Sequence, residues 1–149
     1  MMTWQDTDPA WVAVAGIAGF LVLWLAISVA IGKLGGWRRL ATRYRQSMPV
    51  RGKVLRGQSA AMRYGTSYRN ALNFTVSHRG LGVSVVFPFR AGHAPLLFPW
   101  GDITVSREQA WFGPAVRLSF SRVPDVCITL AERTVQRLRE TAGDLWPER

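Results

Sequence analysis

Few residues of this chain have both the type and the spacing that catalysis or metal binding requires. His78 and His93 lie in different predicted turns, and neither has a cysteine or a carboxylate at metal-ligand spacing. The single cysteine, Cys127, falls in a predicted strand. The acidic residues are too scattered for a paired-carboxylate mechanism, no base singles out one serine as a nucleophile, and the sequence has no glycine-rich phosphate loop. We therefore predict that the protein is not an enzyme and has no catalytic residue, metal or cofactor.

Anion binding is the chemistry that the charge pattern favours. The formal net charge is +10, and no acidic residue lies between Asp8 and Asp102. Many basic residues of that interval follow an apolar segment, where the phosphates of a membrane surface are within reach. Because those head groups are nearer than any nucleic acid, we expect no nucleic-acid partner. The candidate contacts for anionic phospholipid head groups are Lys33, Arg38, Arg39, Arg43, Arg45 and Arg90.

Arg90 stands apart from the other candidates because it lies beside a glycine-containing loop, residues 91–95. Together with Arg63, Arg69 and Arg79 it is expected at one rim of the domain, where a cluster of arginines would attract an anionic head group. The alternative is a basic rim that is simply solvated.

The elements that must position these residues begin with an apolar segment long enough to cross a bilayer. Residues 10–32 carry no charge, and at about 1.5 Å per residue they match the roughly 30 Å hydrocarbon core. We predict a transmembrane helix over residues 10–34. The alternative is a cleaved signal peptide, but acidic residues before the segment and basic residues after it form a stop-transfer pattern.

The charge bias across this segment predicts its orientation. Lysine and arginine follow it but do not precede it, so the positive-inside rule places residues 1–9 outside and the domain in the cytoplasm. The predicted location is the bacterial cytoplasmic membrane. Trp4 and Trp11 lie near one boundary and Trp37 near the other, as in an aromatic belt.

Small residues recur along the predicted span in a pattern that allows a second helix to pack closely. The pairs Ala15 and Gly19, and Ala26 and Ala30, are each four residues apart. Trp24, in the middle of the span, would face lipid or another helix. These residues predict a membrane-protein partner or a homodimer, although alanine and glycine are also common in membrane helices.

Residues 35–49 are predicted to form a basic amphipathic helix next to the membrane. The glycines at 35 and 36 allow the chain to turn, and Pro49 ends the helix. Two placements of its apolar face are open: on an anionic bilayer, where each basic residue contributes on the order of 1 kcal/mol, or on the domain. That face consists of Trp37, Leu40, Ala41, Tyr44 and Met48.

Residues 50–149 are predicted to form one domain, mostly of short strands. Apolar residues alternate over 68–76 and 81–89, with a turn at 77–80. Trp100, at the end of a short strand, is expected to pack on the core, the alternative being an exposed binding platform. Further strands are predicted over 96–100, 103–105, 109–112, 116–120 and 126–130, with a turn at Gly113-Pro114.

A change from period two to helical spacing follows the last strand. Val135, Leu138, Ala142 and Leu145 form one stripe, and Thr129 with Glu132 has capping-box spacing. End signals follow at residues 143 and 147.

The order of these elements predicts an α+β fold. About seven antiparallel strands would curl into a small β-barrel, and the C-terminal helix would cap one open end. This plan is that of the pleckstrin-homology (PH)-like superfold.

Two segments add a family resemblance to this pattern. GWRRLATRYR after the apolar helix, followed by RGLGVSVVFPFRAGHAPLLFPWGDI, resembles uncharacterised bacterial single-pass membrane proteins with a PH- or GRAM-like cytoplasmic domain. The matching motifs are Gly80-Leu81, residues 88–90, residues 94–95, and Phe98-Pro99-Trp100 with Ile103. The resemblance covers residues 36–140 and implies a fold, not an activity.

The sequence therefore predicts a membrane-anchored, PH-like binding module that acts as an adaptor or scaffold. One alternative is a sensor of the anionic lipid surface. Another is an accessory subunit of a membrane complex, held through its helix.

Overall fold

The chain starts with one long apolar helix. The computed structural model describes residues 8–62, 66–86 and 90–147, and its first helix, α1, spans Pro9–Leu34. The side chain of Asp8 accepts a hydrogen bond from the amide of Ala10 at 3.0 Å, which caps the N-terminus. α1 has 26 residues and contains an 18-residue window with a mean hydropathy of 2.5. It is therefore long and apolar enough to cross a membrane, a property that membrane spans share with signal sequences.

A second, short helix turns back onto the domain. Gly36 adopts a left-handed conformation, with φ at 88°, and α2 (Trp37–Tyr44) begins directly after it. The side chains of Trp37, Leu40 and Tyr44 are buried in the core. Of the two placements that the sequence left open, the apolar face therefore packs on the domain and is not available to a bilayer.

This second helix ends earlier than the predicted range of 35–49. Arg45 leaves the helical conformation and forms a β-bridge with Leu96. The amide of the next residue, Gln46, donates to the carbonyl of Pro95 at 2.9 Å. Pairing with the sheet thus stops the helix before Pro49, and Met48 remains exposed.

Seven antiparallel strands form a single curved sheet in the order β4-β3-β2-β1-β7-β6-β5. The α+β class and the number of strands agree with the prediction. The strands are β1 (Lys53–Ala61), β2 (Ser67–Val76), β3 (Leu81–Val85), β4 (Leu96–Phe98), β5 (Ile103–Ala110), β6 (Gly113–Phe120) and β7 (Val123–Ala131). No strand was predicted over the residues of β1, and the strands predicted over 103–105 and 109–112 both begin within the single strand β5.

The predicted closed barrel is not formed, because the sheet remains open. Within the described residues no backbone pairing joins β4 to β5, and β1 pairs with β7 only at Ala61 and Thr129. Side chains hold the two halves together instead. The rings of Phe98 and Phe120 stack with their centroids 3.9 Å apart, and Tyr44 of α2 packs beside both.

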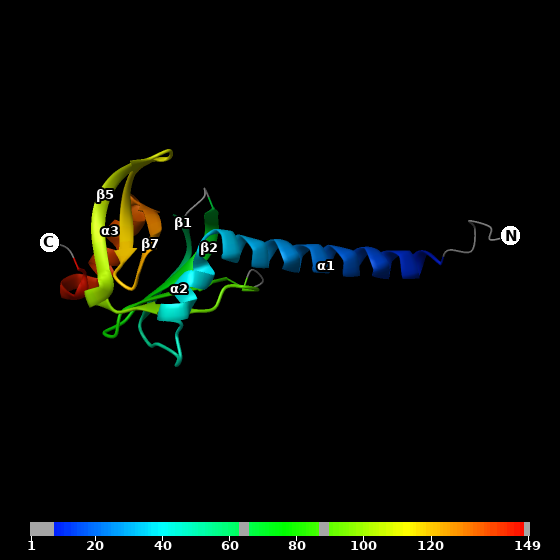
Figure 1. Ribbon diagram of the computed structural model, residues 1–149, viewed down its shortest axis with the longest axis horizontal. Helices are drawn as coiled ribbons and strands as arrows, with labels where there is room; N and C mark the ends of the chain where they lie inside the picture. Colours follow the sequence, from blue (N-terminus) through cyan, green and yellow to red (C-terminus); the bar gives the residue numbers. More distant parts are fainter. Residues whose placement is uncertain (1–7, 63–65, 87–89, 148–149) are drawn as a thin grey trace.

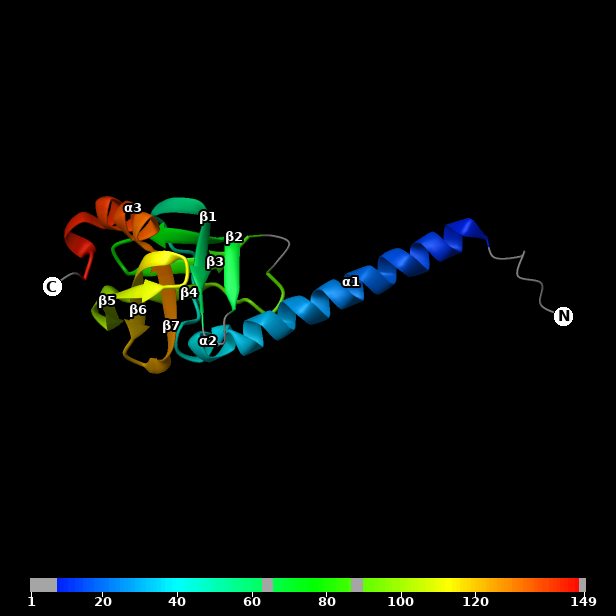
Figure 2. The ribbon, with the colours of Figure 1, turned by 90° about the horizontal axis from the view of Figure 1, so that it is seen from above.

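A C-terminal helix, α3 (Glu132–Ala142), covers the sheet at the end of the domain opposite α1 (Figures 1 and 2). Its predicted stripe is confirmed, since Val135, Leu138 and Ala142 are buried. The predicted capping box is wrong, because the hydroxyl of Thr129 donates to Glu108 in β5. The described residues also include two 3-10 turns, η2 (Trp100–Asp102) and η3 (Gly143–Leu145).

The hairpin between β5 and β6 turns two residues earlier than predicted. Ala110 pairs with Gly113, so Trp111 and Phe112 form the turn and Pro114 lies inside β6. The sequence placed these two aromatic residues in a strand. They lie instead at the tip of a hairpin that projects away from the axis of α1 (Figure 1).

Candidate anion-binding groove

A groove of about 660 Å³ lies where α1 meets the domain. It is formed by the last turns of α1, by α2 and by the loop between β3 and β4. Four of the six predicted anion contacts line it: Lys33, Arg38, Arg45 and Arg90. Its other described lining residues are Val29, Ala41, Gly92, His93, Ala94 and Pro95, none of which is acidic.

The β3–β4 loop is fixed to α2 by hydrogen bonds. The indole Nε1 of Trp37 donates to the carbonyl of Ala94 at 2.8 Å. The amide of His93 donates to the carbonyl of Arg90 at 2.9 Å, which closes a turn within the loop. The guanidinium Nε of Arg90 also donates to the carbonyl of Val85 at 3.2 Å. The end of β3 therefore holds the Arg90 side chain at the groove.

His93 belongs to this loop and is buried, with only 5% of its surface exposed. Its Nδ1 lies 2.8 Å from the carbonyl of Ala91. Since a carbonyl can only accept, Nδ1 carries the proton in the neutral ring, and Nε2 accepts from the hydroxyl of Tyr68 at 2.9 Å. Burial raises the pKa of the Tyr68 hydroxyl, so it remains a donor. The sequence pattern predicted that His93 lies in a turn, but nothing in the pattern predicted that it is buried.

The end of α1 is docked directly on this loop. A Cβ built on Gly32 would lie 2.7 Å from the carbonyl oxygen of Gly92. A Cβ on Gly92, where φ is 74°, would lie 2.9 Å from the Cα of Val29. Ser28 and Gly32 are the buried residues of α1. These close approaches join helix and domain without a flexible tether.

The two remaining anion candidates lie outside the groove. Arg39 forms an ion pair with Asp125 of β7 at 3.0 Å, so its charge is partly neutralised. Arg43 is exposed on α2 and does not line the groove. Arg39 and Arg43 are four residues apart and share one face of α2, whereas Arg38 lies on another. Arg45 follows the end of α2, and its β-bridge with Leu96 places it beside the β3–β4 loop.

The predicted cluster of four rim arginines is not assembled within the described residues. Arg90 lines the groove, whereas Arg69 lines two other pockets on β2. Arg79 is exposed in the β2–β3 turn and lines none of these pockets. Arg63 lies outside the described residues, as do Trp4 and residues 87–89.

Trp100 packs on the core, as predicted, rather than serving as a platform. Its indole Nε1 donates to the carbonyl of Ser77 at 2.8 Å, and its ring meets that of Trp146 edge to face at 6.2 Å. Among the described residues, no three of His, Cys, Asp or Glu come together as a metal site. The groove offers cations and hydrogen-bond donors, and this is the chemistry of anion recognition.

Comparison with known proteins adds no relative. No protein-family model matches the chain, and no curated protein matches it significantly.

Proposed function

We propose that this chain is a single-pass protein of the bacterial cytoplasmic membrane whose domain is a non-enzymatic, PH-like binding module on the cytoplasmic side. The groove beside α1 binds the anionic phospholipid head groups of the same membrane. The observation that carries the proposal is the convergence of Lys33, Arg38, Arg45 and Arg90 at the end of an apolar helix.

The position of the groove supports a lipid ligand. Lys33 follows the apolar part of α1 directly, so a helix that spans the bilayer holds the groove at the level of the phosphates. Each basic residue near an anionic surface contributes on the order of 1 kcal/mol, and the attraction weakens as salt rises. A volume of about 660 Å³ is within the range of small-molecule sites and suits a phospholipid head group.

The topology supports the PH-like assignment. A four-strand half and a three-strand half meet at Ala61 and Thr129, and a C-terminal helix covers the sheet. This agrees with the resemblance in the sequence of residues 36–140. Since such folds host many kinds of binding, the ligand is argued from the groove and not from the fold.

The test is lipid binding by the full chain, purified in a neutral detergent. Native mass spectrometry would count bound phosphatidylglycerol and phosphatidylcholine for the wild type and for an Arg38→Gln, Arg45→Gln variant. We expect the variant to lose roughly 10- to 30-fold in affinity for the anionic lipid, which corresponds to about 2 kcal/mol for two charges. Binding of the neutral lipid should not change.

A variant with the same loss of charge outside the groove is the control. Arg43→Gln with Arg133→Gln removes two exposed arginines, one from α2 and one from α3. If both double variants lose the same affinity, the attraction is a property of the net charge, and the groove is not the site.

A partner helix in the membrane is a second candidate function. Ala15, Gly19, Ala26 and Ala30 are all exposed on α1. At about 100° per residue they fall within an arc of about 60°, on roughly the opposite side from the docked Ser28 and Gly32. The small-residue face thus remains accessible while the domain occupies the other. Gly32 packs against the β3–β4 loop of the domain and is not part of this face.

A further inference from the structure

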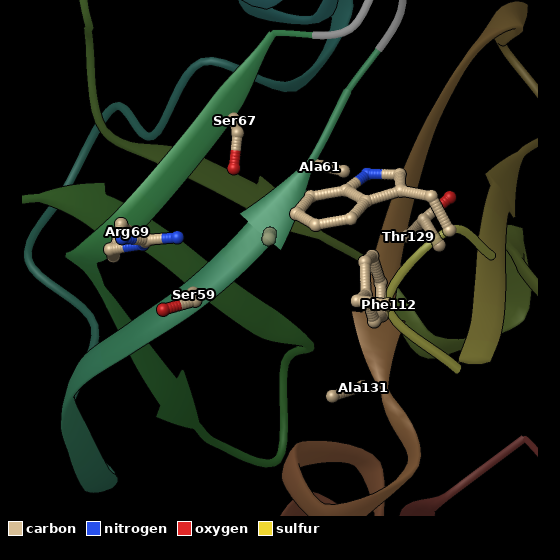
Figure 3. A pocket seen from close by; sticks show the side chains of 9 residues that line it. Ser59, Ala61, Ser67, Arg69, Phe112, Thr129 and Ala131 are labelled. Atoms are coloured by element: carbon tan, nitrogen blue, oxygen red, sulfur yellow. The ribbon is translucent and has the colours of Figure 1, made fainter. Parts of the chain in front are cut away.

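A second pocket, of about 160 Å³, opens on the outer face of the sheet where its two halves meet (Figure 3). One side is formed by β1 and β2 and carries Ser59, Ser67 and Arg69. The other side carries Phe112 from the β5–β6 hairpin tip, with Thr129 and Ala131 from β7 (Figure 3). This pocket shares no residue with the basic groove.

Small side chains leave the floor of the pocket open. Ala60, Ala61 and Ala131 line it, and Ala61 belongs to the one residue pair that joins β1 to β7. Larger residues at these positions would fill the space. An extended segment of chain can therefore lie close to the backbone here without displacing the strands.

The wall is formed by two aromatic residues that the core does not use. Trp111 is 81% exposed and Phe112 is 40% exposed. Their rings meet edge to face, with centroids 5.3 Å apart and planes at 87°. Exposed aromatic side chains that line a concavity are typical of binding sites, because they bury a large area on contact with little loss of conformational freedom.

The rim supplies a positive charge with no acidic partner among the described residues. Arg69 lines the pocket, and no acidic residue does. The carboxylate of Glu108 accepts from the pocket residue Thr129 at 3.0 Å and is ion-paired with Arg117. Its charge is therefore already compensated, and an acidic ligand would meet Arg69 without a competing carboxylate in the pocket.

We propose that this pocket binds a short acidic segment of a protein partner, with one aromatic or leucine side chain between the aromatic wall and the alanine floor. A carboxylate next to that side chain pairs with Arg69. The volume suits one such group, since a cavity of about 150 Å³ holds a benzene ring. The concave shape of the pocket favours a protein partner over the bilayer, because a concave pocket can receive a protruding side chain. This site is independent of head-group binding in the basic groove.

The test uses the full chain in neutral detergent and four labelled hexapeptides, with binding followed by fluorescence anisotropy. The peptide SDEFDS carries both features, SDEADS lacks the ring, SKKFKS reverses the charge, and SKKAKS lacks both. We expect SDEFDS to bind at least tenfold more tightly than the other three. Trp111→Ala and Arg69→Gln should each weaken that binding about tenfold. Both side chains are exposed, so neither variant should unfold.

Arg79→Gln is the matched control, because it removes an exposed arginine of the β2–β3 turn. The proposal is overturned if the four peptides bind equally or not at all, or if Arg79→Gln weakens SDEFDS binding as much as Arg69→Gln does. It is also overturned if Trp111→Ala leaves peptide binding unchanged but, in reconstituted vesicles, reduces quenching by brominated lipids. That result would place the aromatic pair in the bilayer.

Discussion

The hydroxyl of Tyr68 donates a hydrogen bond to Nε2 of His93 at 2.9 Å. The pair lies between the sheet and the β3–β4 loop, on which α1 is docked. Burial raises the pKa of the Tyr68 hydroxyl above its ordinary value. The native state therefore holds the Tyr68 proton more tightly than the unfolded chain, in which the pKa is near its ordinary value of 10.0.

This pair predicts a pH-dependent stability. The contribution of Tyr68 is complete below pH 10 and declines as the pH rises above it, because the unfolded chain then releases the proton first. Tyr68→Phe should lower the free energy of unfolding by about 1–2 kcal/mol at pH 7, since it leaves Nε2 of His93 without its donor. The difference from the wild type should narrow above pH 10. Urea unfolding in detergent at pH 7 and pH 11 measures both values, and a constant difference would contradict the assignment.

We predict that position 92 accepts no residue with a side chain. A Cβ there would meet the Cα of Val29 at 2.9 Å, on a backbone with φ at 74°. Gly92→Ala should lower the free energy of unfolding by about 2–4 kcal/mol, from the left-handed backbone and the clash together. Gly101→Ala is the control, since nothing lies within 4 Å of its Cβ position. Equal stability of the two variants in a urea titration would show that α1 is not docked.

Two variants of Trp37 should separate the contribution of its packing to stability from that of its hydrogen bond. Trp37→Phe keeps an aromatic ring in the core but leaves the carbonyl of Ala94 without its donor, and should lower stability by about 1–3 kcal/mol. Trp37→Ala also leaves a cavity and should lower it by about 3–5 kcal/mol. Differential scanning calorimetry measures both. A milder effect of the alanine variant would mean that α2 is not part of the core.

The proposed membrane orientation predicts the activity of reporters fused after Arg149. A fluorescent protein that matures only in the cytoplasm should be bright, and alkaline phosphatase, which needs the periplasm, should be inactive. The opposite pattern would place the domain outside. Recovery of the chain without residues 1–30 from the periplasm would instead identify α1 as a cleaved signal peptide.

The sequence was informative where burial repeats with a regular period. The stripe of Val135 and Leu138 and the alternation over residues 68–76 predicted α3 and β2 because each follows one face of one element. It was less informative where two distant segments compete for the same group. Thr129 has the spacing of a helix cap, but Glu108 accepts its hydrogen bond from a neighbouring strand.

The candidate sites show the same division. Composition predicted the basic residues, but Arg45 reaches the groove through its β-bridge with Leu96 and not through helical spacing from Arg38. The partners that complete the groove, such as His93 and Pro95, come from a loop some fifty residues later in the chain and carry no local signal. The aromatic wall was missed because the turn was predicted at Gly113-Pro114, which hid the exposure of Trp111.

The docking of α1 on Gly92 has a mechanical consequence. A helix of 26 residues is about 39 Å long, longer than a typical hydrocarbon core, and such helices respond to bilayer thickness by tilting. In most anchored proteins a loose linker absorbs that motion. In the proposed membrane-spanning arrangement the docked helix acts as a lever arm, so that a change of its tilt in the bilayer becomes an equal swing of the domain relative to the membrane plane.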